Sequence, residues 1–332
     1  MAVRMRNPEN IAEFDNLRVR FVTDEGVARA VDGASFDIPR GKTVGLVGES
    51  GCGKSVAALA MMGLLPEGKV EGAIRFQAGA GEVDLPAMPE RARAKLRGAE
   101  IAMVFQEPMT SLNPVLRVGQ QLGDAVRLLG RSKAETRGRV SELLARVQVA
   151  EGVFGMYPHE LSGGMRQRAL IALALARTPK LLIADEPTTA LDATIQMQIL
   201  DLLRDLRDGA GLSMLLISHD LGVIAEMADE VAVMYAGRVV ERGGVRDVLK
   251  NPAHPYTAGL IASRPAPGWT GGRLASIPGG VPDPTALPEN CRFFERCPRR
   301  TDACRGEYPR EIHLGGGHRV ECHLYGEGGE HG

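Results

Sequence analysis

A chain of 332 residues is long for one domain, and its length predicts two folded units. Hydrophobic residues make up 44% and charged residues 24% of it, which places it among ordinary globular proteins, and its net charge of −1 provides no basic face for a nucleic-acid partner. No apolar stretch approaches the ~20 residues that span a bilayer, and residues 1–10 lack the apolar segment of a secretory signal, so we expect a protein that stays in the compartment where it is made.

The first predicted elements are strands followed by a helix. Residues 17–39 predict strands, because the run Arg18-Val19-Arg20-Phe21 alternates and Asp32-Gly33 is a turn signal. Residues 43–47 form a short apolar run that is typical of a buried strand. Residues 54–65 are rich in Ala, Leu and Met and stop before a proline, which predicts a helix.

The loop between that strand and that helix has the pattern G-x-x-x-x-G-K-S. Its glycines let backbone N–H groups converge on a phosphate, and the helix N-terminus adds the positive end of its dipole. Lys54 is expected to reach the β- and γ-phosphates, and the Ser55 hydroxyl to ligate Mg²⁺; the alternative is a glycine-rich turn without function. The predicted nucleotide-binding residues are Gly48, Ser50, Gly51, Cys52, Gly53, Lys54, Ser55 and Val56.

A helical segment follows, at about residues 107–165. Residues 118–129 and 133–149 are periodic helical stretches, and the second is rich in Glu and Arg. This segment therefore predicts helices between two strand-rich parts of the chain.

The strand pattern then returns. Residues 181–184 and 214–217 are apolar runs of the buried parallel type, separated by an amphipathic helix at 192–208, and this alternation predicts an α/β sheet. Asp185 and Glu186 follow the first run, and a carboxylate at the end of a strand, as at Asp185, can hold the Mg²⁺ shell. The alternative is an acidic pair that caps the next helix.

The order of three motifs carries a family resemblance. The phosphate loop is followed by Leu161-Ser162-Gly163-Gly164-Met165-Arg166-Gln167-Arg168 and then by Leu181-Leu182-Ile183-Ala184-Asp185-Glu186-Pro187. This order resembles the ATP-binding subunits of ATP-binding-cassette (ABC) machines. The resemblance implies an α/β P-loop core, in which a mixed sheet is joined by an antiparallel β subdomain and an inserted helical subdomain, plus a small cysteine-containing C-terminal extension.

The same resemblance implies a site that two subunits share. Ser162, Gly163 and Gly164 would grip the γ-phosphate of ATP held on a partner subunit, and a Ser hydroxyl with glycine N–H groups at a helix start suits an anion. Asp192 matches the loop that signals across that dimer, and it also suits the N-cap of the following helix. Both roles are compatible.

Four positions have roles that the resemblance implies. Gln106 matches the glutamine loop, a γ-phosphate sensor that joins Ser55 and Asp185 around Mg²⁺, and Glu186 matches the residue that polarises the attacking water. His219 matches the switch histidine at the γ-phosphate, although a helix-start histidine without a role is the alternative. Phe21 stands where the family places an aromatic ring, commonly Tyr, on adenine, and a core-facing Phe is the rival interpretation.

The C-terminal part narrows the resemblance. After residue 248 the chain becomes rich in Pro and Gly and contains Asn251-Pro252-Ala253-His254-Pro255-Tyr256-Thr257. With the run at 106–114, this is similar to the ATPases of bacterial dipeptide and oligopeptide importers. We therefore expect a nucleotide-binding domain at 1–248 and an importer-type extension at 249–332.

Four of the five cysteines lie in that extension: Cys291, Cys297, Cys304 and Cys322. Paired C-x₂-C knuckles of a zinc ribbon are absent, and four clustered thiolates suit a [4Fe–4S] cluster, which some members of the family carry at this position. Zinc, or free or disulfide-bonded thiols, are the alternatives.

The resemblance thus implies an ATPase that couples ATP binding and hydrolysis to uptake of di- or oligopeptides, or a related solute. Its implied partners are a second ATPase subunit, in this subgroup usually a paralogue, two transmembrane permease subunits and an extracytoplasmic solute-binding protein. Its implied place is the cytoplasmic face of the cell membrane. A non-transport ABC ATPase acting on nucleic acid or ribosomes is the rival, but the coiled-coil arms, interrupting zinc modules or second cassette of such proteins are not evident in the sequence.

Overall fold

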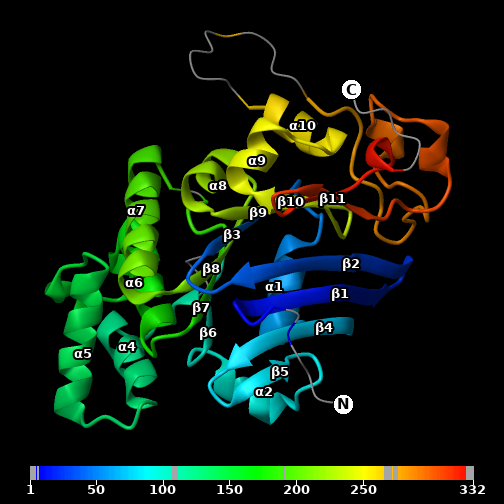
Figure 1. Cartoon of the computed structure of the whole chain (residues 1–332). Coiled ribbons are helices and arrows are strands. Elements are labelled where there is room, and N and C mark those ends of the chain that lie inside the picture. The colour runs from blue at the N-terminus through cyan, green and yellow to red at the C-terminus, as the bar shows by residue number, and fades with distance from the viewer. Residues whose placement is uncertain are drawn as a thin grey trace.

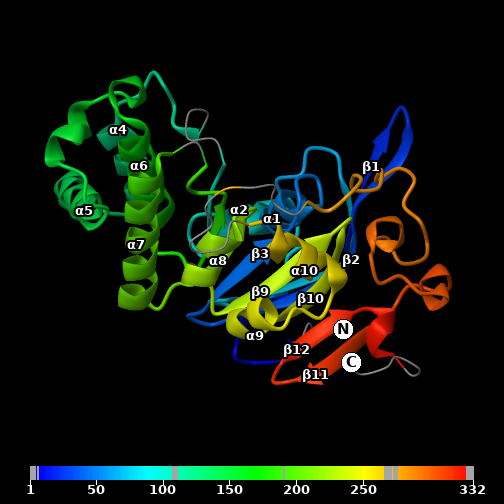
Figure 2. The ribbon, with the colours of Figure 1, turned by 90° about the horizontal axis from the view of Figure 1, so that it is seen from above.

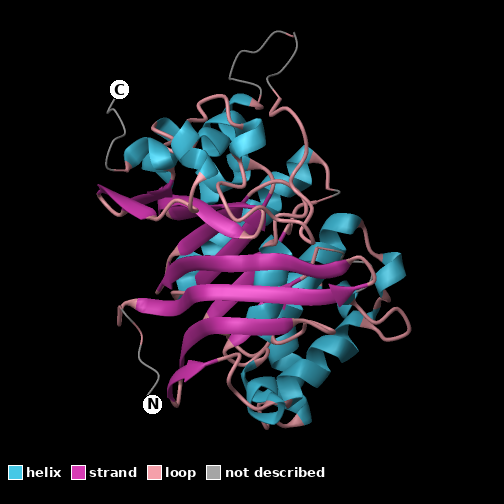
Figure 3. Cartoon of the chain, turned by 90° about the vertical axis from the view of Figure 1, so that its right-hand side faces the viewer, coloured by secondary structure: helices cyan, strands magenta, loops and turns pink. Residues whose placement is uncertain are grey.

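Two β-sheets form the body of the protein in the computed structural model (Figures 1 and 3). The structure describes residues 5, 7–106, 111–189, 191–264, 271 and 276–326, so residues 107–110 at the start of the predicted insertion, part of the 106–114 run, lie outside the described residues. An antiparallel sheet has the order β2 (Gly26–Pro39), β1 (Asn10–Thr23), β4 (Lys69–Ala78), β5 (Gly81–Asp84). The main sheet has the order β11 (Glu311–Gly315), β12 (His318–Glu321), β10 (Arg238–Gly244), β9 (Glu230–Tyr235), β3 (Thr43–Val47), β8 (Ser213–Ser218), β7 (Leu181–Asp185), β6 (Ile101–Val104).

The turn between the first two strands is not where the sequence predicts it. Thr23 pairs with Gly26, so the hairpin turns at residues 24–25. Gly33 lies inside β2, between the pairs Leu17–Ala34 and Arg18–Asp32, with a φ of 102°. A glycine at positive φ is suited to the extra residue of a bulge, and for this reason the predicted turn at Asp32-Gly33 is wrong.

The parallel half of the main sheet is buried on both faces. Strands β3, β7 and β8 consist of buried residues, and β6, β7, β8, β3 and β9 run parallel to their neighbours. Helix α1 (Lys54–Met62) contacts β1 and β2 on one side and β7 on the other, and thus packs between the two sheets. The short helices α8 (Leu221–Met227) and α9 (Val245–Lys250) add buried residues to the core, whereas α2 (Glu90–Leu96) has none.

Four helices gather at one side of the molecule (Figures 1 and 2): α4 (Val118–Arg127), α5 (Lys133–Arg146), α6 (Gly163–Leu175) and α7 (Ala193–Ala210). Helices α4 and α5 lie within the two predicted stretches. Ser132 begins α5 with a capping box, in which its hydroxyl accepts from the Glu135 N–H and Glu135 accepts from the Ser132 N–H. Single turns of 3-10 helix at Glu151–Gly155 and Pro158–Glu160 connect α5 to α6.

The C-terminal part is continuous with the main sheet. After α10 (Pro255–Ala262) and the 3-10 turns Phe294–Arg296 and Asp302–Arg305, strand β12 pairs antiparallel with β10, and β11 adds the edge (Figure 2). A last 3-10 turn spans His323–Tyr325. Among the helices described, none combines the length and apolar character that a membrane crossing requires.

Candidate functional site

The predicted phosphate loop connects β3 to α1 and requires its glycines. Gly48, Gly51 and Gly53 have φ angles of 154°, 78° and 105°. A Cβ at residue 48 would lie 2.1 Å from the Met234 carbonyl oxygen, and one at residue 53 would lie 2.3 Å from the Ala30 carbonyl oxygen. The loop therefore packs its backbone against neighbouring strands, while Ser50 and Gly51 remain exposed at its tip.

The side chain of a lysine in the loop is bound by the loop's own backbone. Lys54 is buried, and its Nζ donates to the carbonyl oxygens of Gly48 at 2.7 Å and Glu49 at 3.0 Å. Cys52 is 1% exposed, and burial raises the pKa of its thiol. A cation held inside a ring of backbone groups at a helix N-terminus fits a phosphate group. Val56 is half-buried and packs on the core.

The predicted Mg²⁺ residues are only partly brought together. The Ser55 hydroxyl donates to Asp185 Oδ1 at 3.2 Å, and burial raises the pKa of the Asp185 carboxyl. The Asp185 carboxylate and the Ser55 hydroxyl lie at the phosphate loop and offer the oxygen ligands that Mg²⁺ prefers. Gln106 does not contact this pair, because its side chain lies on Glu186 instead.

Glu186 is the centre of a hydrogen-bond network. Its backbone has a φ of 47°, and its N–H donates to the Ile217 carbonyl oxygen at 2.9 Å. One carboxylate oxygen accepts from His219 Nδ1 at 3.1 Å, and the other accepts from Gln106 Nε2 at 3.1 Å and Thr189 Oγ1 at 2.8 Å. Burial raises the pKa of Glu186, but the bonds from His219 and Thr189 outweigh burial, and the net shift is downward.

The structure thus brings Glu186, Gln106 and His219 together from three separate segments. Thr189 completes the network and was not singled out from the sequence. Its position three residues after Glu186, at the start of the segment that leads to α7, is the local signal that could have indicated it.

The predicted trans-acting residues lie apart from the phosphate loop. Ser162 and Asp192 are exposed N-caps of α6 and α7, accepting from the N–H groups of Met165 and Ile195. Gly163 is exposed and Gly164 is half-buried against α7. Both views place α6 with α4, α5 and α7, away from α1 (Figures 1 and 2). An exposed helix start with a Ser cap is an arrangement that can bind an anion of another molecule.

Phe21 is half-buried on β1. It packs against the core, and its ring carbons would lie 3.1 and 3.3 Å from a Cβ at residue 68. The ring therefore has the partial exposure of an adenine platform and the packing of a core residue, and its role stays a prediction.

The four C-terminal cysteines are close enough to influence one another. All are free thiols. Besides burial, Cys304 raises the pKa of Cys291, Cys297 and Cys322, and Cys291 and Cys297 each raise that of Cys322. Burial, followed by these neighbours, raises the pKa of Cys291 to about 11 and that of Cys322 to about 12. Within the described part of the chain, no three His, Cys, Asp or Glu side chains are placed to hold one metal ion.

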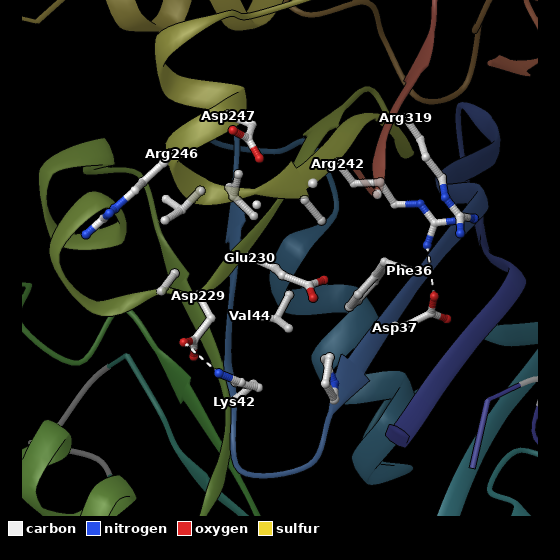
Figure 4. A pocket seen from close by; sticks show the side chains of 18 of the residues that line it. Phe36, Asp37, Lys42, Val44, Asp229, Glu230, Arg242, Arg246, Asp247 and Arg319 are labelled. Atoms are coloured by element: carbon white, nitrogen blue, oxygen red, sulfur yellow. Dashed lines mark hydrogen bonds and ion pairs between the residues drawn. The ribbon is translucent and has the colours of Figure 1, made fainter. Parts of the chain in front are cut away.

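Two cavities differ in their relation to the loop. A cavity of about 770 Å³ borders Ser50 and Gly51 and extends between the β1–β2 turn and residues 281–285. Another, of about 810 Å³, surrounds Glu230 and is bordered by the ion pairs Lys42–Asp229 and Arg242–Asp37 (Figure 4). No phosphate-loop residue lines the second cavity, so it is separate from the candidate site.

Two contacts reach the phosphate loop from the C-terminal extension and were not predicted. The Glu49 N–H donates to Tyr256 Oη at 2.8 Å, and the Glu49 carboxylate pairs with Arg296. Tyr256 belongs to the run His254-Pro255-Tyr256, and Arg296 directly precedes Cys297, so each lies in a motif whose role the sequence left open.

Family comparisons agree with the motifs. Residues 31–189 match the model of the family described as "ABC transporter", and residues 240–304 match "Oligopeptide/dipeptide transporter, C-terminal region". The chain is 47% identical over 325 residues to the oligopeptide transport ATP-binding protein AppD of Bacillus subtilis, covering 96% of this chain and 98% of that protein. It is 45% identical over 315 residues to the oligopeptide transport ATP-binding protein OppD of Salmonella typhimurium, covering 93% of each.

Solved structures agree with the fold. A dimeric structure of MJ0796, a bacterial ABC transporter cassette, superposes with a TM-score of 0.63 at 27% identity and covers 71% of this chain and 99% of that one. A post-hydrolysis structure of the same cassette, bound to ADP and Pi, gives a TM-score of 0.64 at 26% identity. The predicted class, an α/β cassette core with an antiparallel sheet and a helical subdomain, is confirmed.

Proposed function

The chain belongs to the ABC transporter family, as an ATP-binding subunit of its oligopeptide/dipeptide branch that hydrolyses ATP to drive transport, and from this premise we propose how its residues divide that work. Residues 48–56 bind the phosphates of ATP, with Lys54 on the β- and γ-phosphates. Ser55 and Asp185 would hold Mg²⁺, which would neutralise charge on the phosphate oxygens, and Gln106, which donates to Glu186 in this structure, is the proposed third ligand. Phe21 stacks on adenine.

Glu186 orients and polarises the attacking water. Its pKa is shifted downward, so at neutral pH it is a carboxylate, the form that can accept a hydrogen bond from the water. His219 and Gln106 contact its two oxygens from different segments. In the proposed mechanism both sense the γ-phosphate, and Gln106 connects the site to the helical subdomain while His219 connects it to β8. This convergence on Glu186, next to the Ser55–Asp185 pair, is the observation that carries the proposal.

The site is completed by a second subunit. Ser162, Gly163 and Gly164 bind the γ-phosphate on the partner, and Asp192 contacts the partner's loop; the exposed caps of α6 and α7 and their distance from α1 support this division. The partner is a paralogous ATPase subunit. Closure of this dimer drives two transmembrane permease subunits, which a solute-binding protein outside the membrane supplies with di- or oligopeptides.

The protein acts at the cytoplasmic face of the membrane, bound to the permease. We divide it into a nucleotide-binding domain at 1–248, with the helical subdomain at about 107–165, and an extension at 249–332. Its extension resembles the C-terminal region of peptide transporters over residues 240–304, which supports a peptide cargo.

The test replaces the proposed water-orienting residue. Glu186→Gln keeps the size of the side chain but removes the negative charge, so phosphate release should fall by about 10²–10⁴ while ATP still binds and the ATP-bound dimer accumulates in size-exclusion chromatography. Glu142→Gln, on the exposed face of α5, is the matched control and should hydrolyse normally. Undiminished hydrolysis by Glu186→Gln would refute the assignment.

We also propose that Cys291, Cys297, Cys304 and Cys322 bind a [4Fe–4S] cluster. Four thiols that lie close enough to influence one another electrostatically support a group with four thiolate ligands. Protein purified without oxygen should be brown and contain iron and sulfide in near-stoichiometric amounts. A colourless protein that contains zinc, or no metal, would reject the cluster.

A further inference from the structure

The C-terminal extension holds one residue of the phosphate loop from two directions. Arg296 forms a forked ion pair with Glu49, with Nη1 2.6 Å from one carboxylate oxygen and Nη2 2.9 Å from the other. The hydroxyl of Tyr256 accepts from the Glu49 N–H at 2.8 Å. Charge-assisted forked bonds fix both distance and orientation. The extension therefore fixes the backbone and the side chain of Glu49 together.

Arg296 is itself held rigidly. Its side chain is 5% exposed, its Nε donates to the Pro278 carbonyl oxygen at 2.8 Å, and its guanidinium lies 5.7 Å from the ring centre of Tyr235 and 5.9 Å from that of Phe293. A guanidinium stays charged throughout the physiological pH range, so the ion pair with Glu49 persists. Because Arg296 is held in place, it also fixes the position of the Glu49 carboxylate.

A second arginine reaches the same loop by another route. Arg292 is buried, forms an ion pair with Asp32, and donates to the Ala236 carbonyl oxygen at 2.6 Å. The next residue, Gly237, donates its N–H to the Cys52 carbonyl oxygen at 2.9 Å. Thus Cys291-Arg292 and Arg296-Cys297, at the two ends of one short segment, are each connected to the loop.

We propose that Arg296 is a positioning residue of the phosphate loop, and that it makes ATP affinity depend on the folded state of the four-cysteine segment. The Glu49 carbonyl oxygen holds Lys54 Nζ together with the Gly48 carbonyl oxygen and Cys52 Sγ, so a displacement of Glu49 moves the group proposed to meet the phosphates. The proposal rests on the proposed function, in which residues 48–56 bind ATP.

The four-cysteine segment is connected to the two arginines through the packing of Phe293. Phe293, between the two arginines, is 2% exposed and packs edge-on against Tyr235, whose ring also lies 4.6 Å from that of Tyr256. Cys291 and Cys297 bracket this packed unit. Whatever ligand or bond fixes the two thiols therefore fixes Phe293 and both arginines, and loosening the thiols releases Glu49.

The test measures ATP affinity of the full chain by equilibrium binding of a fluorescent ATP analogue with Mg²⁺, alongside amide hydrogen exchange of the loop peptide. Arg296→Gln should weaken binding about tenfold, the factor for one lost charge-assisted hydrogen bond, and speed exchange at residues 48–53. Arg296→Lys keeps the charge but not the fork and should lie between. Arg242→Gln removes another largely buried arginine, paired with Asp37 and Glu311, and should bind ATP normally.

A double-mutant cycle separates positioning from general destabilisation. If Arg296 acts through Glu49, Glu49→Gln should weaken binding as Arg296→Gln does, and the double variant should be no weaker than either single one. Cys297→Ser should likewise weaken binding in the wild-type background and have no further effect beside Glu49→Gln. Unchanged affinity of Arg296→Gln, or independent and multiplying effects in either cycle, would overturn the proposal.

Failure of the proposed function has a different signature. Lys54→Ala should abolish binding of the analogue. If Lys54→Ala binds ATP normally, the assignment of residues 48–56 is wrong and the role of Arg296 falls with it. If Lys54→Ala fails to bind while Arg296→Gln binds normally, the ATP site stands and only the positioning role is rejected.

Discussion

Replacing either glycine of the Ser162-Gly163-Gly164 run by alanine adds one methyl group, and the two replacements should differ in their effect on stability. A Cβ at residue 164 would lie 2.7 Å from Cγ2 of Ile195, at the start of α7, whereas a Cβ at residue 163 would lie 3.4 Å from Leu191 Cδ2. Carbon atoms in good contact are about 3.5–4.0 Å apart. Gly164→Ala therefore overlaps with a branched side chain by about 1 Å, and Gly163→Ala does not.

The expected magnitudes follow from two opposing effects. Overpacking costs about 1–3 kcal/mol, and replacing a helical glycine by alanine gains at most about 1 kcal/mol, less in a first turn. Gly164→Ala should therefore lower the free energy of unfolding by about 1–2 kcal/mol. Gly163→Ala should leave it unchanged or slightly raised. Both should reduce ATP hydrolysis by the assembled dimer, because the added methyl groups occupy the surface proposed to approach the partner's phosphate.

Urea unfolding of the nucleotide-free chain, followed by circular dichroism, measures the first effect at constant m value. Ile195→Ala removes the overlapping atom, so Gly164→Ala combined with Ile195→Ala should be at least about 0.5 kcal/mol more stable than the sum of the two single changes predicts. If Gly164→Ala is as stable as the wild type, or if the two changes add, the packing argument is wrong.

Two further predictions concern buried titratable groups. Burial lowers the pKa of His254 to about 4, so between pH 6.5 and 4 the unfolded chain binds a proton that the folded chain does not. The free energy of unfolding should therefore fall by about 2 kcal/mol from pH 7 to pH 5, and by less in His254→Asn. Thermal or urea unfolding at the two pH values would measure this difference. Equal pH dependence of the two proteins would contradict this. Burial also raises the pKa of Cys52, so its thiol should resist iodoacetamide at pH 7.5 in the folded chain and react once urea unfolds it, as peptide mass spectrometry can follow; rapid labelling of the folded protein would show that the loop opens.

Local motifs explain why so much of the site could be predicted. The phosphate loop, the Asp185–Glu186 pair and the caps at Ser162 and Asp192 each depend on a few consecutive residues at the end of a strand or the start of a helix. Their local geometry is set by backbone conformation and by hydrogen bonds within a turn, which spacing in the sequence encodes.

The errors and omissions are of another kind. Asp32-Gly33 has the composition of a turn, but its positive-φ glycine serves a bulge, and only the pairing of β1 with β2 decides between the two. Arg296 and Glu49 are 247 residues apart in the chain, and the pairing of β12 with β10 joins segments that no local pattern connects. Contacts of this range depend on how the finished sheet places its edges.

Glu241 attaches the extension to the sheet that carries the ATP site. This buried carboxylate on β10 accepts from the N–H groups of Ala253 and His254 and lies 2.7 Å from Nε2 of His318 on β12. Because a buried carboxylate is costly without all of its partners, the start of α10 and the C-terminal hairpin must form together on β10. His254 then caps α10 by accepting from the Tyr256 N–H, and this places the Tyr256 hydroxyl against the phosphate loop. The residues that attach the extension to the sheet are thus the same ones that bring it into contact with the loop that binds ATP.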